Sequence, residues 1–507
     1  MSEVKAGAVI NYVAFVIRIA TSLLLTPFII SNLGVEEYGL FMLSHSILVW
    51  LALTDLGLGA TVSKYVVTYR AKGELKEQAH FLGQSLMLYT LLGFIGLAGG
   101  LVGYWNLDAL FPSLQEIQRE TFSILYLLTL GNFVLCFPLR PLNAVPGAYQ
   151  RFIVPGIISL STSLLNAGLT VLLLWLGFKS IALTMMSVGV AITMLLWGVG
   201  YAVIKLGAKV KFSNPDITLY KEMFGFAMWV FLSQVMDMFY WQAGSPILAS
   251  VSGTVAVSVF SLGILFSQCF MAASTAISGV LAPKLMHMVA LNASKEELTH
   301  VMSRAGRLQL FLLVLIILGF ACFGRDFLVL WVGKTIGENI TTIWMGALCV
   351  MIPLLIPLSQ NTGLAILQAL SIHKGRAIIL FYSSLICVVL GYILSYILGP
   401  IGMFIGTAIS LTIGQGFMIN LYYQKKAGLH MGLFFRHTYL PMLFPVVILA
   451  TLGIGISYAV TISDWMDFTI TAACYGTVSA ATLFILYLNK DERLMFITPV
   501  KKILRIK

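Results

Sequence analysis

Fourteen long apolar stretches run through this chain, and they decide what it can fold into. Each is long enough to cross a hydrocarbon layer as a helix, which takes about 20 residues. They are too long for barrel strands of about 9–11 residues, so helices must satisfy their backbone groups. The stretches are 7–33, 38–66, 81–104, 121–145, 152–177, 179–204, 223–248, 253–283, 305–332, 341–370, 376–398, 400–423, 438–460 and 468–489. We expect an all-α polytopic membrane protein with about 14 transmembrane helices.

The loops leave little room for chemistry outside the membrane. Only 10% of the 507 residues are charged, against about 25% in an ordinary soluble protein. The longest loops hold about 20 residues, too few for a soluble catalytic domain. The sequence shows no metal-ligand cluster, nucleophile motif or phosphate-binding loop, and its six cysteines are scattered among apolar runs. We therefore expect no enzyme, no cofactor or metal, and no nucleic-acid partner.

The basic residues predict the orientation of the chain. If the N-terminus is cytoplasmic, 26 of the 31 Lys and Arg residues fall on the inner side and four on the outer side, with Arg18 inside the first stretch. This asymmetry satisfies the positive-inside rule. The net charge of +11 is thus a topology signal, and the basic tail is expected to lie on anionic lipid. We predict a multi-pass protein of the cell inner membrane with both termini cytoplasmic.

The chain repeats itself at an offset of 219 residues. Gly34 corresponds to Gly253, and Pro138 corresponds to Pro357. Six helices per repeat keep both repeats in the same orientation, which predicts two pseudo-twofold lobes and alternating access at a site near the midplane. We expect an N-lobe at 1–205, a cytoplasmic inter-lobe loop at 206–221, a C-lobe at 222–424, a cytoplasmic loop at 425–436, a C-terminal helix pair at 437–489 and a basic cytoplasmic tail at 490–507.

Three ionisable residues stand out deep inside predicted spans, where charged groups are costly and are functional candidates. Arg18 is about 15 Å into the first helix, near the midplane. Asp237 is at the repeat-equivalent position, and Asp55 lies in the inner half of the second helix. Either Arg18 takes part in transport, or it forms a structural ion pair with one of the two aspartates.

Further polar candidates lie near the inner ends of helices. Lys64 and Arg140 are either snorkelling topology anchors or part of a cationic funnel that favours a phosphate-bearing headgroup. Gln360 and Asn361, pseudo-equivalent to the segment around Arg140, could bond sugar hydroxyls or other helices. No ATP motif is present, so energy must come from an ion gradient, the membrane potential or the substrate gradient.

Several segments resemble bacterial Wzx-type polysaccharide-biosynthesis flippases, a family of the multidrug/oligosaccharidyl-lipid/polysaccharide exporter (MOP) superfamily. The similar segments are TPFIISNLGVEEYGL at 26–40, DLGLG at 55–59 followed by Lys64, PGAYQRF at 146–152 and NTGLAILQA at 361–369. The resemblance covers nearly the whole chain and is specific to the superfamily rather than to a substrate.

The resemblance implies a flippase that moves polyprenyl-diphosphate-linked oligosaccharide to the outer leaflet for O-antigen, capsule or exopolysaccharide synthesis. It implies diphosphate contacts at Arg18, Lys64 and Arg140, and H⁺ or Na⁺ coupling at Asp55 and Asp237. Its partners would be the lipid-linked oligosaccharide, membrane lipids, a polymerase and glycosyltransferases, with the transporter itself monomeric. The alternatives are an ion-coupled multidrug or organic-cation antiporter of the same superfamily, and a non-transporting assembly scaffold.

Overall fold

The computed structural model describes residues 3–291, 293–370 and 372–494, so the basic tail from residue 495 onward lies outside them. Within these ranges the chain is helical and holds no β-strand. This confirms the all-α polytopic fold expected from the apolar stretches.

The number of helices fit to cross a membrane is twelve, or thirteen if the bent pair Ile217–Gly225 and Val230–Trp241 forms one span. This count covers only the described part of the chain and is lower than the expected fourteen. The difference includes the 65-residue stretch Lys295–Ser359, which passes the hydropathy test as one piece. That stretch holds two helices, α14 (Lys295–Ile336) and α15 (Ile340–Ser359).

The chain divides into two compact units, Met1–Ser261 and Leu262–Lys507. We call them unit 1 and unit 2. The boundary falls inside one helix, α13 (Thr254–Ala290). The division into lobes at 1–205 and 222–424 stays a prediction.

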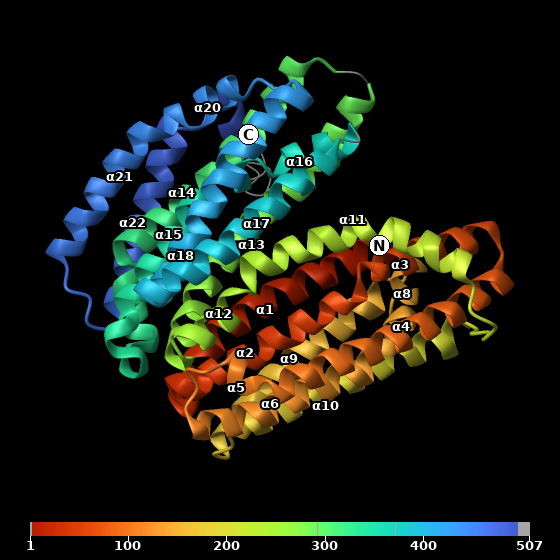
Figure 1. The fold of residues 1–507 in the computed structure, drawn as a ribbon. Helices are drawn as coiled ribbons and strands as arrows, with labels where there is room; N and C mark the ends of the chain where they lie inside the picture. The colour runs from red at the N-terminus through yellow and green to blue at the C-terminus, as the bar shows by residue number, and fades with distance from the viewer. Residues whose placement is uncertain (1–2, 292, 371, 495–507) are drawn as a thin grey trace. The chain divides into compact units, whose positions relative to one another are not determined.

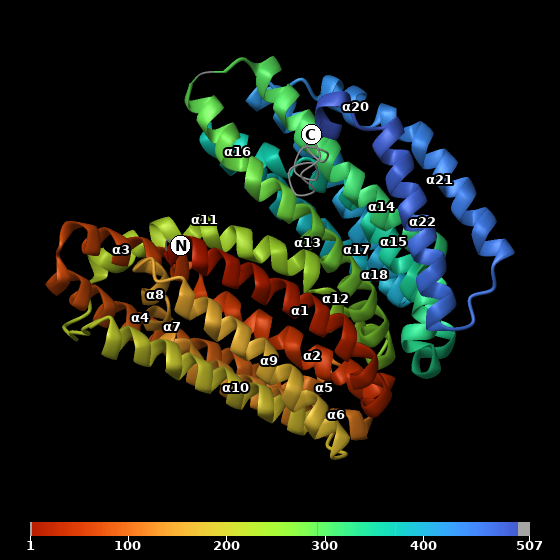
Figure 2. The ribbon, with the colours of Figure 1, turned by 180° about the vertical axis from the view of Figure 1, so that it is seen from behind.

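Unit 1 is a bundle of long helices. In it α1 packs along α9, and α10 packs against both α9 and α6 (Figures 1 and 2). Its main helices are α1 (Glu3–Leu33), α2 (Val35–Leu51), α3 (Leu58–Lys72), α4 (Leu75–Trp105), α6 (Glu116–Cys136), α9 (Ile153–Trp175), α10 (Ser180–Gly200), α11 (Ile217–Trp241) and α12 (Gly244–Val251).

The repeat is visible in the backbone of unit 1. Gly34 and Gly253 have φ values of 82° and 83° and precede α2 and α13. The two helix starts touch each other reciprocally: the Ser258 hydroxyl donates to the Val35 carbonyl, and a Cβ at Gly39 would lie 2.1 Å from the Thr254 carbonyl oxygen. Positions 35 and 39 of the first repeat correspond to 254 and 258 of the second, so each contact is the repeat-equivalent of the other. This reciprocity is what a pseudo-twofold axis produces.

The loop expected to tether the lobes is fastened along α4. The Gln84 side chain donates to the Ser213 hydroxyl at 2.7 Å and to the Asn214 carbonyl at 2.8 Å. Its carbonyl oxygen accepts from the Tyr220 hydroxyl at 2.7 Å. Gln84 is fully buried. The segment before α11 is therefore held against α4 by a side chain that is nearly saturated with hydrogen bonds, and the Lys211 N–H adds a bond to the Ala79 carbonyl.

In unit 2, α14 packs against α15, α21 and α22, while α17 packs along α18 (Figures 1 and 2). The remaining helices there are α16 (Asn361–Ala369), α17 (His373–Leu398), α18 (Pro400–Leu411), α19 (Ile419–Tyr422), α20 (Met431–Thr438), α21 (Leu440–Ala459) and α22 (Trp465–Leu486).

A buried ion pair joins the C-terminal helices to α14. Arg307 donates from Nε to both Glu492 oxygens at 2.9 and 3.1 Å, and from Nη1 to the His437 carbonyl at 2.7 Å. Both charged side chains are almost completely buried. Such a pair is costly to break because one partner would be left as an uncompensated buried charge.

Candidate functional site

Two of the candidate residues of unit 1, Asp55 and Arg140, lie near an interruption between α2 and α3. Leu56 and Gly57, with φ values of 49° and 76°, both adopt the left-handed conformation. For leucine this conformation costs about 1–2 kcal/mol. A Cβ at Gly57 would lie 2.5 Å from the Ala227 carbonyl oxygen of α11. The break therefore needs glycine both for its backbone conformation and for the close approach of α11.

Asp55 holds this break together. Its carboxylate accepts from the Tyr89 hydroxyl at 2.6 Å and from the Gly59 backbone N–H at 3.2 Å. Asp55 is 6% exposed and Tyr89 is fully buried. The Gly59 N–H belongs to the first turn of α3, whose N–H groups have no partner within the helix. Both carboxylate oxygens are thus used to satisfy the fold.

Arg140 lies near this pair because α6 is interrupted in the same region. Pro138 and Pro141 each lack an N–H, and α6 gives way to a 3₁₀ turn, Phe137–Leu139, and a one-turn helix, Arg140–Asn143. The Arg140 guanidinium carbon is 5.3 Å from the centre of the Phe137 ring. The Phe137 ring is in turn 5.1 Å from the Tyr89 ring, measured between ring centres. The exposed Arg140 side chain is therefore linked through Phe137 to the tyrosine that donates to Asp55.

The other charged candidates lie on exposed helix surfaces of unit 1. Arg18 is exposed on α1, with its guanidinium carbon 5.8 Å from the centre of the Phe15 ring. Lys64 is exposed on α3, with its ammonium 5.9 Å from the Tyr65 ring. Asp237 is exposed on α11.

The uncharged candidates of unit 2 lie where α15 ends and α16 begins. Pro353 and Pro357 lie inside α15, and the helix stops at Ser359. Ser274, the repeat-equivalent of Asp55, donates to the Leu358 carbonyl at 2.9 Å and accepts from the Asn361 amide at 3.1 Å. The Ser274 hydroxyl thus supplies a hydrogen-bond donor to a carbonyl at the end of a helix.

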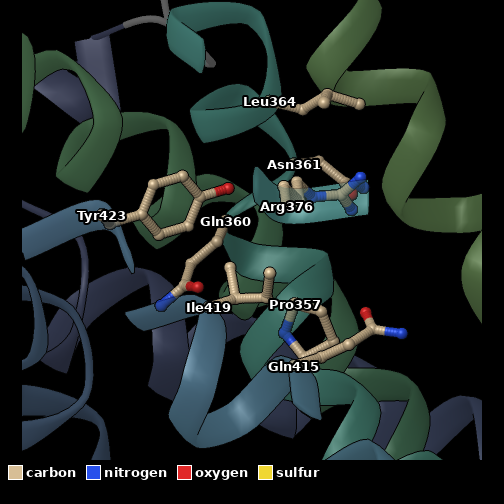
Figure 3. Close-up of a pocket in the computed structure, with 8 residues that line it drawn as sticks. All are labelled: Pro357, Gln360, Asn361, Leu364, Arg376, Gln415, Ile419 and Tyr423. Atoms are coloured by element: carbon tan, nitrogen blue, oxygen red, sulfur yellow. The ribbon is translucent and has the colours of Figure 1, made fainter. Parts of the chain in front are cut away.

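Gln360 and Asn361 line a pocket in unit 2 (Figure 3). The pocket holds about 280 Å³ of empty space, including its open mouth. Gln360 is 2% exposed and donates to the Asn420 side chain at 2.8 Å. Figure 3 shows Arg376 beside Asn361, with the Tyr423 hydroxyl turned toward them. The lining residues are Pro357, Gln360, Asn361, Leu364, Arg376, Gln415, Ile419 and Tyr423.

Sequence reasoning missed several residues of these two sites. Tyr89 carries no charge and looks like any other packing aromatic. Arg376 was counted only as an inner topology residue, and Tyr423 was not considered. Ser274 could have been found by applying the offset of 219 to Asp55, which identifies its repeat-equivalent directly.

The comparisons with known proteins concern the fold. No known family profile matches this chain. The "Uncharacterized membrane protein EpsK" of Bacillus subtilis (strain 168) is 24% identical over 507 residues, which cover 97% of each chain. The structure of the lipid II flippase MurJ in an inward closed conformation aligns with a TM-score of 0.71 at 14% identity, over 94% of this chain and 98% of MurJ.

A second group of similar structures consists of drug transporters. An inward-facing multidrug resistance MATE family transporter of the MOP superfamily aligns with a TM-score of 0.60 at 15% identity, over 81% of this chain and 95% of that transporter. At such low identities these alignments establish a shared fold. The chain is a multi-pass helical membrane protein with the fold that MurJ and the MATE transporters have in common.

Proposed function

We propose that this protein is a flippase of the Wzx type. It moves polyprenyl-diphosphate-linked oligosaccharide from the cytoplasmic to the outer leaflet of the bacterial inner membrane, for the synthesis of a surface polysaccharide. The observation that carries the proposal is the extent of the match to MurJ, which includes 94% of this chain, against 81% for the MATE transporter. The relative named EpsK spans the same length as this chain.

The charges of unit 1 support an anionic substrate. The exposed cations Arg18, Lys64 and Arg140 offer guanidinium and ammonium groups to a diphosphate. Buried Asp55 is engaged by Tyr89 and Gly59, which leaves it poorly suited to bind a cationic drug. Asp237, exposed on α11, is the better candidate for H⁺ or Na⁺ coupling. The head group crosses the membrane while the polyprenyl chain stays in lipid.

The runner-up is a drug or organic-cation antiporter, which the MATE-like fold favours. It differs from the flippase in the sign of the charge it needs. An antiporter of this kind requires acidic residues on the transport path, and loss of Arg18 would leave it active.

Arg18→Ala tests the proposal in the producing bacterium. We expect surface polysaccharide to disappear while the protein still accumulates in the membrane, because a diphosphate loses its midplane cation. Arg18→Lys keeps the charge but not bidentate contact, and should retain part of the activity. Lys72→Ala, which removes an exposed cation at the end of α3, is the matched control. Normal polymer from the Arg18→Ala strain, together with increased sensitivity to cationic drugs on gene deletion, would favour the antiporter.

A further inference from the structure

The segment that follows α10 in unit 1 exposes large apolar side chains beside positive charges. Lys205, Lys209 and Lys211 are all exposed, and the segment 203–212 holds no acidic residue. Beside these lysines, the side chains of Ile204 and Phe212 are 79% and 66% exposed. Cations next to large apolar side chains are typical of chains that lie in a membrane interface. The apolar groups there reach the acyl chains, while the cations stay at the level of the headgroups.

The exposure of Phe212 does not come from a loose loop, because the residues on both sides of it are fastened to α4. The Lys211 N–H donates to the Ala79 carbonyl at 2.9 Å. On the other side of Phe212, the Ser213 hydroxyl is 2.9 Å from Nδ1 of His80. The segment accordingly lies beside the start of α4 (Figures 1 and 2). Its hydrogen-bonded neighbours therefore hold Phe212 in place while its ring stays uncovered by protein.

The contacts with α4 also indicate the depth of Phe212 in the membrane. A Cβ at Gly83 would lie 2.2 Å from the Lys211 carbonyl oxygen and 3.2 Å from the Phe212 backbone nitrogen. Gly83 is the third residue of the apolar stretch 81–104. The Phe212 backbone is therefore level with the first turn of a span, where aromatic side chains are enriched at the boundary between headgroups and hydrocarbon. An exposed ring at this depth meets acyl chains.

We propose that the segment 203–212 is a binding surface for anionic phospholipid of the inner leaflet, with Phe212 among the acyl chains and Lys209 and Lys211 on the lipid phosphates. Charge complementarity selects an anionic lipid, because three lysines without an acidic residue attract a negatively charged membrane surface. The adjacent segment 72–77 holds two lysines and two glutamates, and so adds no net charge. This proposal concerns the surrounding lipid rather than the transported substrate, and it does not depend on the flippase function.

The test places the photoreactive residue p-benzoylphenylalanine at position 212 of the full-length protein, in nanodiscs of phosphatidylcholine with a minor share of phosphatidylglycerol. Irradiation should give lipid adducts, identified by mass. We expect phosphatidylglycerol to be enriched among them about tenfold over its share in the disc, as two lysines near an anionic surface should produce. The double substitution Lys209→Gln and Lys211→Gln should reduce this enrichment to about that share. The matched control, Lys425→Gln with Lys426→Gln, removes two exposed lysines of unit 2 and should leave the enrichment unchanged.

The same label in living cells distinguishes a lipid from a protein partner. An adduct of lipid mass supports the proposal, whereas an adduct of protein size at position 212 would overturn it. The proposal also fails if no lipid adduct forms in the nanodiscs, or if the Lys209 and Lys211 double variant keeps the full enrichment. All the substituted side chains are exposed, so we expect every variant to elute like the wild type in size-exclusion chromatography. The Arg18→Ala protein should give the same lipid adducts, which separates this proposal from the proposed transport function.

Discussion

Residues 55 and 274 occupy equivalent positions in the two repeats, yet one is a buried carboxylate and the other a buried hydroxyl. Asp55 lies directly before the two left-handed residues that separate α2 from α3. It accepts a hydrogen bond from the Gly59 N–H at the start of α3. Ser274 lies within the continuous helix α13 and donates to the Leu358 carbonyl at the end of α15.

The difference shows how each residue type matches the helix end that it serves. The start of a helix presents N–H groups without partners and favours negative charge, so it takes an acceptor such as aspartate. The end of a helix presents carbonyls without partners, so it takes a donor such as serine. The repeat thus preserved the position of a polar side chain, while the location of the nearby helix break decided its chemistry.

Replacing Ser274 by aspartate, the residue type of position 55, should have the largest effect on stability. Ser274→Asp places a carboxylate against the Leu358 carbonyl in a site that is fully buried. An uncompensated buried charge costs several kcal/mol, so we expect little folded protein by size-exclusion chromatography in detergent. Ser274→Ala, the control, loses the hydroxyl and should cost about 1–3 kcal/mol. If Ser274→Asp and Ser274→Ala unfold at the same temperature, a neutral side chain is not required at this site.

Substitution of Gly57 tests whether α11 depends on its close approach to the break between α2 and α3. Gly57→Ala meets both a left-handed backbone and the Ala227 carbonyl, whereas Gly73→Ala meets the same backbone conformation, φ 74°, with no atom within 4 Å. Both variants pay about 1–2 kcal/mol for the conformation. We expect only Gly57→Ala to increase hydrogen exchange in α11. Equal exchange in the two variants would mean that α11 does not depend on this close approach.

The smallest effect should come from the hydrogen bond to the carboxylate. Tyr89→Phe leaves Asp55 with one described donor, Gly59, and should cost about 1.5–3 kcal/mol because the bond involves a charge. The matched control is Tyr126→Phe, which removes a 2.9 Å bond from a buried tyrosine to the neutral Gly100 carbonyl and should cost about 0.5–1.5 kcal/mol. Thermal unfolding of both variants in detergent gives the comparison. A larger loss at Tyr126 would argue that the hydrogen bond to Asp55 is no stronger than a bond to a neutral carbonyl.

Much of the fold could be predicted from the sequence because long apolar stretches identify membrane helices. A span of about 20 apolar residues can form few structures other than a helix. The constant offset of 219 also predicts that Gly34 and Gly253 are equivalent, and their φ angles of 82° and 83° agree with this. The separate apolar stretches at 305–332 and 341–370 also correspond to the two helices α14 and α15, which the span count takes as one piece.

The candidate sites were only half predictable. The charges of Arg18, Asp55 and Asp237 stand out in an apolar sequence, and the prolines around residues 138 and 357 indicate breaks. Polar residues that carry no charge give no such signal. Tyr89 is recognised only from its hydrogen bond to Asp55, and Ser274 only through its place in the repeat. Arg376 looked like one more positive residue on the inner side.

The sequence by itself determined an all-helical chain built from two repeats, because burying a backbone in hydrocarbon leaves so few solutions. Only the tertiary structure decided that the carboxylate of Asp55 accepts from Tyr89 and Gly59, whereas Arg376 Nε and Gln360 Oε1 have no hydrogen-bond partner in the described part of the chain. Hydrogen-bond satisfaction depends on which side chains meet across distances of tens to hundreds of residues, and no local pattern in the chain encodes it.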